Sequence, residues 1–327
     1  MTLSPQPAIS VIVPCHNSQS TIERTLRSLA SQPDTPGEEI EFVIVLDYPD
    51  DSTPEIVERL VKELPGLRHR AVVIKHDRNR GAAQAQATGM LAARGEWLGR
   101  ADADDYVSPG YFSNLLHSAQ LANALIAVAP MAVETGGNKP AKILMPENLS
   151  NLNALTLNTV NFSLANKLFH RSVVLGNEAL LPIERMDCWD DLSVVARVLA
   201  LNPTIAYTDT ETLYHYTILP GKKSLSRTAK EKILADHIAC ARMIESWMKQ
   251  HGLTARYTPF LNRLKFISKV KYLRGHNRDV RAWKETFPEV NSLATQIGGL
   301  PLWQRLAFMT VDKLPAAVTS AVANLIP

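Results

Sequence analysis

Short apolar runs alternate with amphipathic stretches over the first hundred residues of the chain. Four of the runs, at 8–14, 41–47, 71–75 and 97–101, are continuous rather than alternating, which is typical of strands covered on both faces. The stretches between them favour amphipathic helices. Strands and helices that alternate in this way predict an α/β fold with a doubly wound, mostly parallel sheet.

The predicted helices have recognisable starts and the sheet has further strands. Ser20 is expected to cap the first helix, because Glu23 follows three residues later and completes a capping box. Beyond the fourth run, the pattern predicts a helix over about 110–122, an apolar strand at 125–131 and another strand at 204–207.

The fourth apolar run ends on three crowded carboxylates, Asp102, Asp104 and Asp105. Carboxylates this close repel one another unless they are fully solvated or share a cation. An Asp-x-Asp at the carboxyl end of a buried strand can hold a divalent metal and leave positions open for a diphosphate. The pattern therefore predicts a site for a metal-bound nucleotide, and the alternative is a polar turn.

Other polar groups follow the neighbouring strands, where ligands of α/β sheets bind. They are the segment Pro14 to Asn17, the acid Asp47 at the end of the second run, and the segment Arg78 to Gly81. No GxGxxG follows the first run and no GxxxxGK[ST] occurs in the chain. A dinucleotide-binding Rossmann site and a P-loop are therefore both unsupported.

A second polar cluster lies later in the chain. Asp190 and Asp191 follow Trp189 at the start of a helix that is predicted to reach about 201. Acids in a first helical turn are favoured by the helix dipole alone, so this pair has a purely structural explanation too. The sequence LYHY at 213–216 then leads to a basic loop at 221–227 that suits a phosphate.

Length, charge and cysteines narrow the class of protein. The 327 residues allow two domains, and the net charge is +3. The three cysteines are scattered, so neither a disulfide framework nor a thiolate zinc site is indicated. Without a long apolar run or a signal peptide in this sequence, we expect a cytoplasmic protein, and we expect no nucleic-acid partner.

The last hundred residues are basic and helical. From Thr228 onward there are 15 Lys and Arg against 7 Asp and Glu. Lys265 and Lys269 stand among apolar residues in a predicted helix at 259–273, and 300–327 is amphipathic. This pattern favours peripheral contact with an anionic inner membrane surface. The alternative is that the helices pack on the catalytic domain or on a second subunit.

The order of the motifs carries a resemblance. VIVPCHN, a second strand ending on Asp47, RNRGAA, RADADD, NKLFHR, WDDL and LYHY together resemble the inverting family 2 glycosyltransferases of the GT-A fold, of the type that builds bacterial cell-surface polysaccharides. The resemblance covers about residues 8 to 227. It implies a GT-A catalytic domain at 1–227. The helical region at 228–327 lies outside the resemblance, and we expect it to contact membrane, acceptor or another subunit.

The resemblance also implies roles for individual residues. It makes Asp191 the catalytic base. It places a Mn²⁺ or Mg²⁺ ion on Asp104, Asp102 and His215. The nucleotide-sugar would be bound by Pro14, His16, Asn17, Asp47, Arg80, Gly81, Arg100, Asp102, Ala103, Lys223 and Arg227.

Two departures from the family pattern leave questions open. Family members often have Asp-Asp-Gly-Ser after the second strand, whereas this chain continues from Asp47 into Tyr48, so Asp47, Asp50 and Asp51 all stay candidates for contacting the base. A Glu-Asp pair is common where this chain has two aspartates before Leu192.

The function that the resemblance implies is a metal-dependent single displacement. A sugar, with a UDP-sugar as the expected donor, would move to a hydroxyl of a cell-surface glycan or lipid-linked acceptor, with inversion. Two alternatives stay open at this stage: a nucleotidyltransferase, and a nucleotide-sugar-binding or assembly protein without turnover. The sequence does not specify the donor sugar, the acceptor, the linkage or the oligomeric state.

Overall fold

The structure is a computed structural model that describes residues 6–33, 37, 39–135, 141–176, 180–182, 186, 188–218, 230–273, 279–294 and 302–313. It has two compact units. The first consists of Met1–Ser150 with Thr159–Lys223, and the second of Asn151–Asn158 with Ser224–Pro327. Residues 151–158 thus join the helical unit although they lie within the predicted catalytic domain.

The described part of the first unit contains eleven strands and eight helices. The strands are β1 (Ile9–Cys15), β2 (Ile40–Leu46), β3 (Ala71–Lys75), β4 (Trp97–Arg100), β5 (Tyr106–Val107), β6 (Ile126–Val128), β7 (Met131–Glu134), β8 (Lys142–Leu144), β9 (Lys167–His170), β10 (Ile205–Tyr207) and β11 (Tyr214–Thr217). The helices are α1 (Ile22–Ala30), α2 (Thr53–Glu63), α4 (Ala82–Ala92), α5 (Tyr111–Leu121), α6 (Thr159–Phe162), α7 (Arg171–Leu175) and α8 (Asp190–Ala200), and the short α3 (Pro65–Arg68) follows α2.

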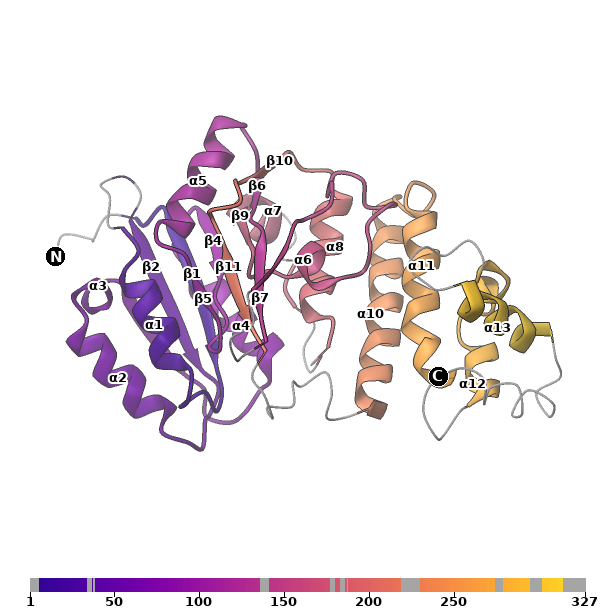
Figure 1. Ribbon diagram of the computed structural model, residues 1–327, viewed down its shortest axis with the longest axis horizontal. Coiled ribbons are helices and arrows are strands. Elements are labelled where there is room, and N and C mark those ends of the chain that lie inside the picture. The colour runs from indigo at the N-terminus through magenta and orange to yellow at the C-terminus, as the bar shows by residue number, and fades with distance from the viewer. Residues whose placement is uncertain are drawn as a thin grey trace. The chain divides into compact units, whose positions relative to one another are not determined.

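A seven-stranded sheet in the order β10-β6-β9-β4-β1-β2-β3 is the centre of the first unit (Figure 1). All of its pairs are parallel except those of β9, which runs antiparallel to β4 and β6. The predicted α/β fold with a mostly parallel sheet is therefore confirmed. Because β1 pairs in parallel with both β2 and β4, the carboxyl ends of these three strands share one edge of the sheet.

The predicted strand at 125–131 is wrong as a single element. It divides at Pro130 into β6, which belongs to the large sheet, and β7, which belongs to a second sheet in the order β5-β11-β7-β8. Proline has no backbone N–H to donate to a strand ladder, and its carbonyl here accepts the N–H of Tyr214. The break lets the chain leave one sheet and enter the other.

The predicted capping box of the first helix is also wrong. The N-cap of α1 is Thr21, and no side chain caps the helix. Glu23 instead accepts hydrogen bonds from Arg27 (2.7 Å) and Arg59 (3.0 Å), which are stronger partners than a backbone N–H.

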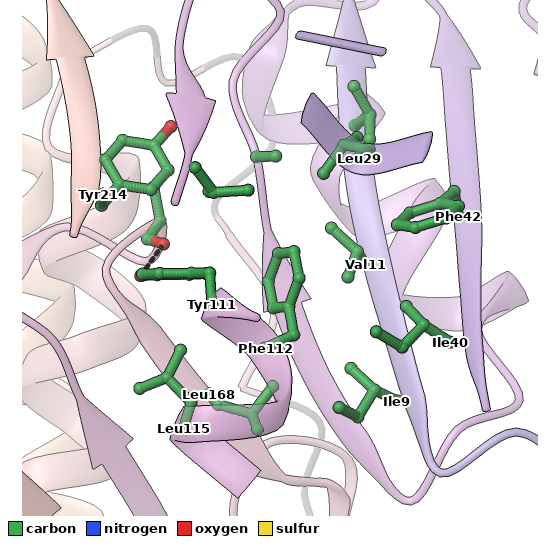
Figure 2. Packing of buried hydrophobic residues seen from close by; sticks show 14 of the residues in the cluster. Ile9, Val11, Leu29, Ile40, Phe42, Tyr111, Phe112, Leu115, Leu168 and Tyr214 are labelled. Atoms are coloured by element: carbon green, nitrogen blue, oxygen red, sulfur yellow. Dashed lines mark hydrogen bonds between the residues drawn. The ribbon is translucent and has the colours of Figure 1, made fainter. Parts of the chain in front are cut away.

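The two faces of β1 contact different helices. Ile9, Val11 and Val13 belong to a buried cluster that also includes Leu29 of α1 and Phe112 of α5 (Figure 2). On the opposite face, α4 packs against β1 and β2. Residues on both faces are buried, which explains why the strand is continuously apolar rather than alternating.

The second unit contains α10 (Lys230–Gln250), α11 (Thr258–Lys269), α12 (Val280–Glu285) and α13 (Leu302–Lys313), with 3₁₀ turns at Val270–Leu273 and Pro288–Leu293. Its core includes three aromatic rings, those of Phe266, Trp283 and Phe308. In the described part of the chain, no helix is long and apolar enough to cross a membrane.

The lysines predicted to face a membrane are buried instead. Lys265 pairs with Glu245 and Glu289. Lys269 is fully buried, and its ammonium donates to carbonyl oxygens of the chain. These two residues therefore do not support membrane contact, because helical spacing does not show which side of a helix faces the core.

At Gly95, the chain before β4 passes very close to the backbone of β1. A Cβ at this position would lie 2.5 Å from the backbone nitrogen of Ser10 and 2.7 Å from the carbonyl carbon of Ile9. Backbone atoms cannot move aside as a flexible side chain can, so we expect Gly95→Ala to lower the free energy of unfolding by about 2 kcal/mol or more. Leu91→Ala, on the exposed side of α4, is the control. Urea unfolding measures both, and equal stabilities of the two variants would contradict the prediction.

Candidate active site

Asp47 connects the end of β2 to the Arg-Gly segment that precedes α4. Its carboxylate accepts the backbone N–H groups of Arg80 and Gly81, both at 2.8 Å, and Nδ1 of His76 lies 2.7 Å away. Gly81 has a φ of +86°, a conformation that glycine adopts without strain. Both oxygens of Asp47 are thus occupied by the protein, while its backbone carbonyl contacts the ring of His16 (2.9 Å).

The loop after β2 leaves one of the three candidate acids open. Asp51 accepts hydrogen bonds from Thr53 and from the N–H of Gln19. Asp50 is exposed, and no hydrogen bond to its carboxylate occurs within the described residues. Tyr48 is 57% exposed and has a φ of +49°, a strained conformation for a residue with a side chain.

Arg100, at the end of β4, links the acidic motif to the second acidic cluster. Its Nε donates to Asp102 at 2.6 Å, and its Nη1 donates to Asp191 at 2.6 Å and lies 3.7 Å from Asp190. The side chain is only 10% exposed. Burial opposes the charge of this guanidinium, but the carboxylates outweigh it and hold the pKa of Arg100 above its ordinary value.

Asp105, the third acid of the motif, is bonded within the protein rather than open to a ligand. It is buried, and its carboxylate accepts the hydroxyl of Tyr214 (2.8 Å) and the N–H of Thr217 (2.7 Å). The Tyr214 oxygen in turn accepts the N–H of Asp102 (3.1 Å). Burial, with Asp102 and Asp104 nearby, raises the pKa of Asp105 well above its usual value. Tyr214 therefore joins the acidic loop to the second sheet. The sequence motifs gave no sign of this role.

The ring of His215 contacts residues other than the carboxylates of the acidic loop. Successive side chains of a strand point to opposite faces, so His215 lies on the other side of β11 from Tyr214. Its Nδ1 is 2.9 Å from Glu134, its Nε2 is 3.3 Å from the hydroxyl of Ser108, and its ring stacks on Tyr106. These contacts do not support its predicted role as a metal ligand.

The Asp190–Asp191 pair begins α8 after Trp189, whose φ is +67°. The second oxygen of Asp191 accepts the N–H of Leu164 at 3.1 Å. Burial, together with the charge of Asp191, raises the pKa of Asp190 to about 7. Asp191 accepts hydrogen bonds at both oxygens, from Arg100 and from Leu164.

Negative charge accumulates around the acidic loop. Burial raises the pKa of the Cys15 thiol, and Asp102 and Asp104 add to that shift. No group of three or more His, Cys, Asp or Glu that could hold a metal by itself occurs among the residues described. Mg²⁺ is usually bound by one or two carboxylates plus substrate phosphates, and Asp104 with Asp102 fits that pattern.

The remaining predicted residues fall into two groups. Pro14 and Asn17 flank His16 at the end of β1, the Asn17 side chain accepts the N–H of Asp50, and Ala103 is buried in the acidic loop. Lys223 and Arg227 lie outside the described residues.

Comparison with known proteins decides the family. The family model described as "Glycosyl transferase family 2" matches residues 10–175, about half of the chain. The chain belongs to glycosyl transferase family 2. It is 30% identical to the succinoglycan biosynthesis protein ExoO of Rhizobium meliloti over 259 residues, covering 76% of this chain and 70% of that protein. It is 29% identical to the putative glycosyltransferase EpsH of Bacillus subtilis, covering 77% and 72%.

Solved structures agree on the fold of this family 2 glycosyltransferase. The structure is similar to residues 1–349 of TarS of Staphylococcus aureus in complex with UDP-GlcNAc, with a TM-score of 0.67. That likeness covers 97% of this chain and 90% of that chain at 18% identity. The predicted GT-A fold with additional C-terminal helices is therefore confirmed.

The acid pair gives a pH-dependent prediction. Because the pKa of Asp190 is raised on folding, its contribution to stability is present below about pH 4 and is lost as the pH rises through about 7. Asp190→Asn removes this dependence. We expect the free energy of unfolding of the variant to exceed that of wild type by about 2 to 3 kcal/mol more at pH 8 than at pH 5, measured by urea unfolding without added metal. The same difference at both pH values would contradict the assigned pKa.

Proposed function

We propose that this glycosyltransferase moves a sugar from a UDP-sugar to a hydroxyl of a bacterial polysaccharide or lipid-linked acceptor, by a metal-dependent single displacement that inverts the anomeric centre. The observation that carries the proposal is that one guanidinium, that of Arg100, bonds both Asp102 and Asp191. Asp102 suits a metal-bound donor diphosphate, and Asp191 suits an acceptor hydroxyl.

The names of similar proteins support the donor and the type of product. ExoO is named for succinoglycan biosynthesis. TarS is named a poly(ribitol-phosphate) beta-N-acetylglucosaminyltransferase, and one of its structures contains UDP-GlcNAc. For this chain we infer the same classes, a UDP-sugar donor and a glycan acceptor, and leave the identity of the sugar open.

On the donor side, Asp104 and Asp102 would hold Mn²⁺ or Mg²⁺. A bound divalent ion would neutralise the charge that develops on the leaving diphosphate. Asp102 reaches Arg100 with one oxygen, and no hydrogen bond to its second oxygen occurs within the described residues. Two hydrogen bonds fix the loop itself. The guanidinium of Arg24 donates to the Asp104 carbonyl (2.7 Å), and the hydroxyl of Tyr214 donates to the Asp105 carboxylate.

On the acceptor side, Asp191 would act as the general base. A sugar hydroxyl is a weak nucleophile near neutral pH, so a carboxylate within hydrogen-bond reach must take its proton as it attacks the anomeric carbon. Arg100 and the N–H of Leu164 each donate to one oxygen of Asp191, which fixes the orientation of the carboxylate toward an acceptor hydroxyl. Attack opposite the leaving diphosphate would invert the anomeric configuration.

At the nucleotide end, Asp50 is the acid that we propose for contacting the base. Asp47 is buried, and its oxygens accept from the backbone of Arg80 and Gly81 and contact His76, so we assign it to holding the loop rather than to contacting the nucleotide. Asp50 is exposed on the loop that follows β2, and its backbone N–H donates to the side chain of Asn17.

For the helical unit we propose peripheral contact with the acceptor or with the cytoplasmic face of the inner membrane. The buried Lys265 and Lys269 do not supply such a contact, whereas Arg281 is largely exposed. Flotation with vesicles containing anionic phosphatidylglycerol tests the membrane part. Co-flotation of the full chain that salt reverses supports it, and a protein that stays at the bottom of the gradient contradicts it.

The donor assignment is tested with a panel of nucleotide-sugars and added Mn²⁺. We expect release of UDP that needs the metal and falls at least about 100-fold in Asp104→Asn, because the variant loses a charged oxygen ligand. Asp191→Asn should keep donor binding and lose about 10²- to 10⁴-fold in transfer. Binding of UDP-sugars without any turnover would favour the non-catalytic alternative, and formation of a nucleotide-sugar from a sugar phosphate and a nucleoside triphosphate would favour a nucleotidyltransferase.

A further inference from the structure

Lys167, the first residue of β9, carries a buried charge that the proposed reaction does not use directly. The side chain is fully buried. Its Nζ donates to the carbonyl oxygens of Val160 (3.2 Å) and Ser163 (2.7 Å) and to the side-chain oxygen of Asn166 (2.8 Å). These three acceptors match the three protons of an ammonium group, and none of them is a carboxylate. Burying an ammonium without a hydrogen-bonded carboxylate is costly, so its retention needs a reason.

The ammonium organises the short segment between α6 and β9. Besides its own three bonds, the segment is held by the Asn166 amide, which donates to the carbonyls of Ala129 (2.9 Å) and Val160 (3.0 Å). The buried hydroxyl of Tyr111 donates to the carbonyl of Ala165 (3.2 Å; Figure 2). Residues 160–166 therefore have several fixed points within the core of the first unit.

This same segment holds the carboxylate of Asp191. The N–H of Leu164 donates to Oδ2 of Asp191 at 3.1 Å, and the Ser163 hydroxyl lies 3.4 Å from that oxygen. The carbonyl of Ser163 is the nearest of the three acceptors of Lys167. One residue thus receives the ammonium through its carbonyl and faces the carboxylate through its hydroxyl.

We propose that Lys167 is a positioning residue for the catalytic base: its ammonium fixes residues 160–166 so that Ser163 and Leu164 hold one oxygen of Asp191 while Arg100 holds the other. The inference rests on the proposed role of Asp191. A carboxylate fixed at both oxygens keeps a single orientation, and small misplacements of a reacting group are costly in rate. The charge of Asp191 also favours the protonated form of Lys167, against the burial that lowers the pKa of Lys167 to about 7.

The helical unit supplies a matched control. Lys269 is also fully buried, and its Nζ donates to the carbonyls of Trp283 (3.1 Å), Thr286 (2.7 Å) and Phe287 (3.1 Å) and to the side chain of Asn291. It belongs to the second unit, whereas Lys167 and its acceptors belong to the first. A buried lysine that serves stability alone should behave as Lys269 does.

The test compares Lys167→Met with Lys269→Met in the full chain. Methionine keeps much of the length of lysine and removes the ammonium. We expect both variants to unfold at lower urea concentration, and only Lys167→Met to lower kcat for sugar transfer, by about 10- to 100-fold, with the KM for the UDP-sugar within about twofold of wild type. Equal kcat values for the two folded variants would overturn the proposal.

A double-mutant cycle shows whether Lys167 acts through the base. In Asp191→Asn, the further change Lys167→Met should lower transfer by less than twofold, because the group that it positions is already disabled. An undiminished loss in that background would overturn the proposal. Lys167→Arg, which keeps the charge but not the length, is expected to retain more transfer than Lys167→Met. If the methionine variant does not fold, Lys167→Arg must still show a kcat loss that is smaller in Asp191→Asn than in wild type, and equal losses would overturn the proposal.

The role of Asp191 and the role of Lys167 can be disproved separately. Full transfer by Asp191→Asn would remove the base assignment and the role of Lys167 together. Loss of transfer in Asp191→Asn with unchanged kcat in Lys167→Met would remove only the role of Lys167 and leave the proposed function standing.

Discussion

The guanidinium of Arg100 is the interaction on which the acidic edge of the sheet depends. It bonds Asp102 and Asp191, each at 2.6 Å, and lies close to Asp190. Without this charge, the three carboxylates would repel one another in a largely buried place, and removing one partner of a buried pair is strongly destabilising. Arg100 therefore makes it possible for a donor-binding acid and a separate base to occupy one site.

The supports of this site come from distant parts of the fold. Tyr214 of the second sheet holds Asp105 and the backbone of Asp102, and the segment before β9 holds Asp191. Asp47 fixes the loop before α4. Strained backbone occurs here as well, at Tyr48 and Trp189, which is common where function rather than stability sets the conformation.

The sequence predicted most of the parallel sheet, the acidic motif and the family, because continuous apolar runs and short motifs are local signals. Other features depend on tertiary contacts. Nothing local shows that Lys167 donates inward or that Tyr214 reaches Asp105, and helical spacing placed Lys269 on a surface although it is buried. The break between β6 and β7 could have been predicted from Pro130, because proline has no N–H for a strand ladder. The continuous apolar run around it favoured a single strand instead.

The central claim is a single displacement in which one carboxylate acts as the base and none becomes bonded to the sugar. The most direct measurement is the anomeric configuration of the first product formed from an α-linked UDP-sugar, with the acceptor or with water, followed by proton NMR before the free sugar can mutarotate. The account predicts a β-configured product. A product that retains the α configuration would contradict it.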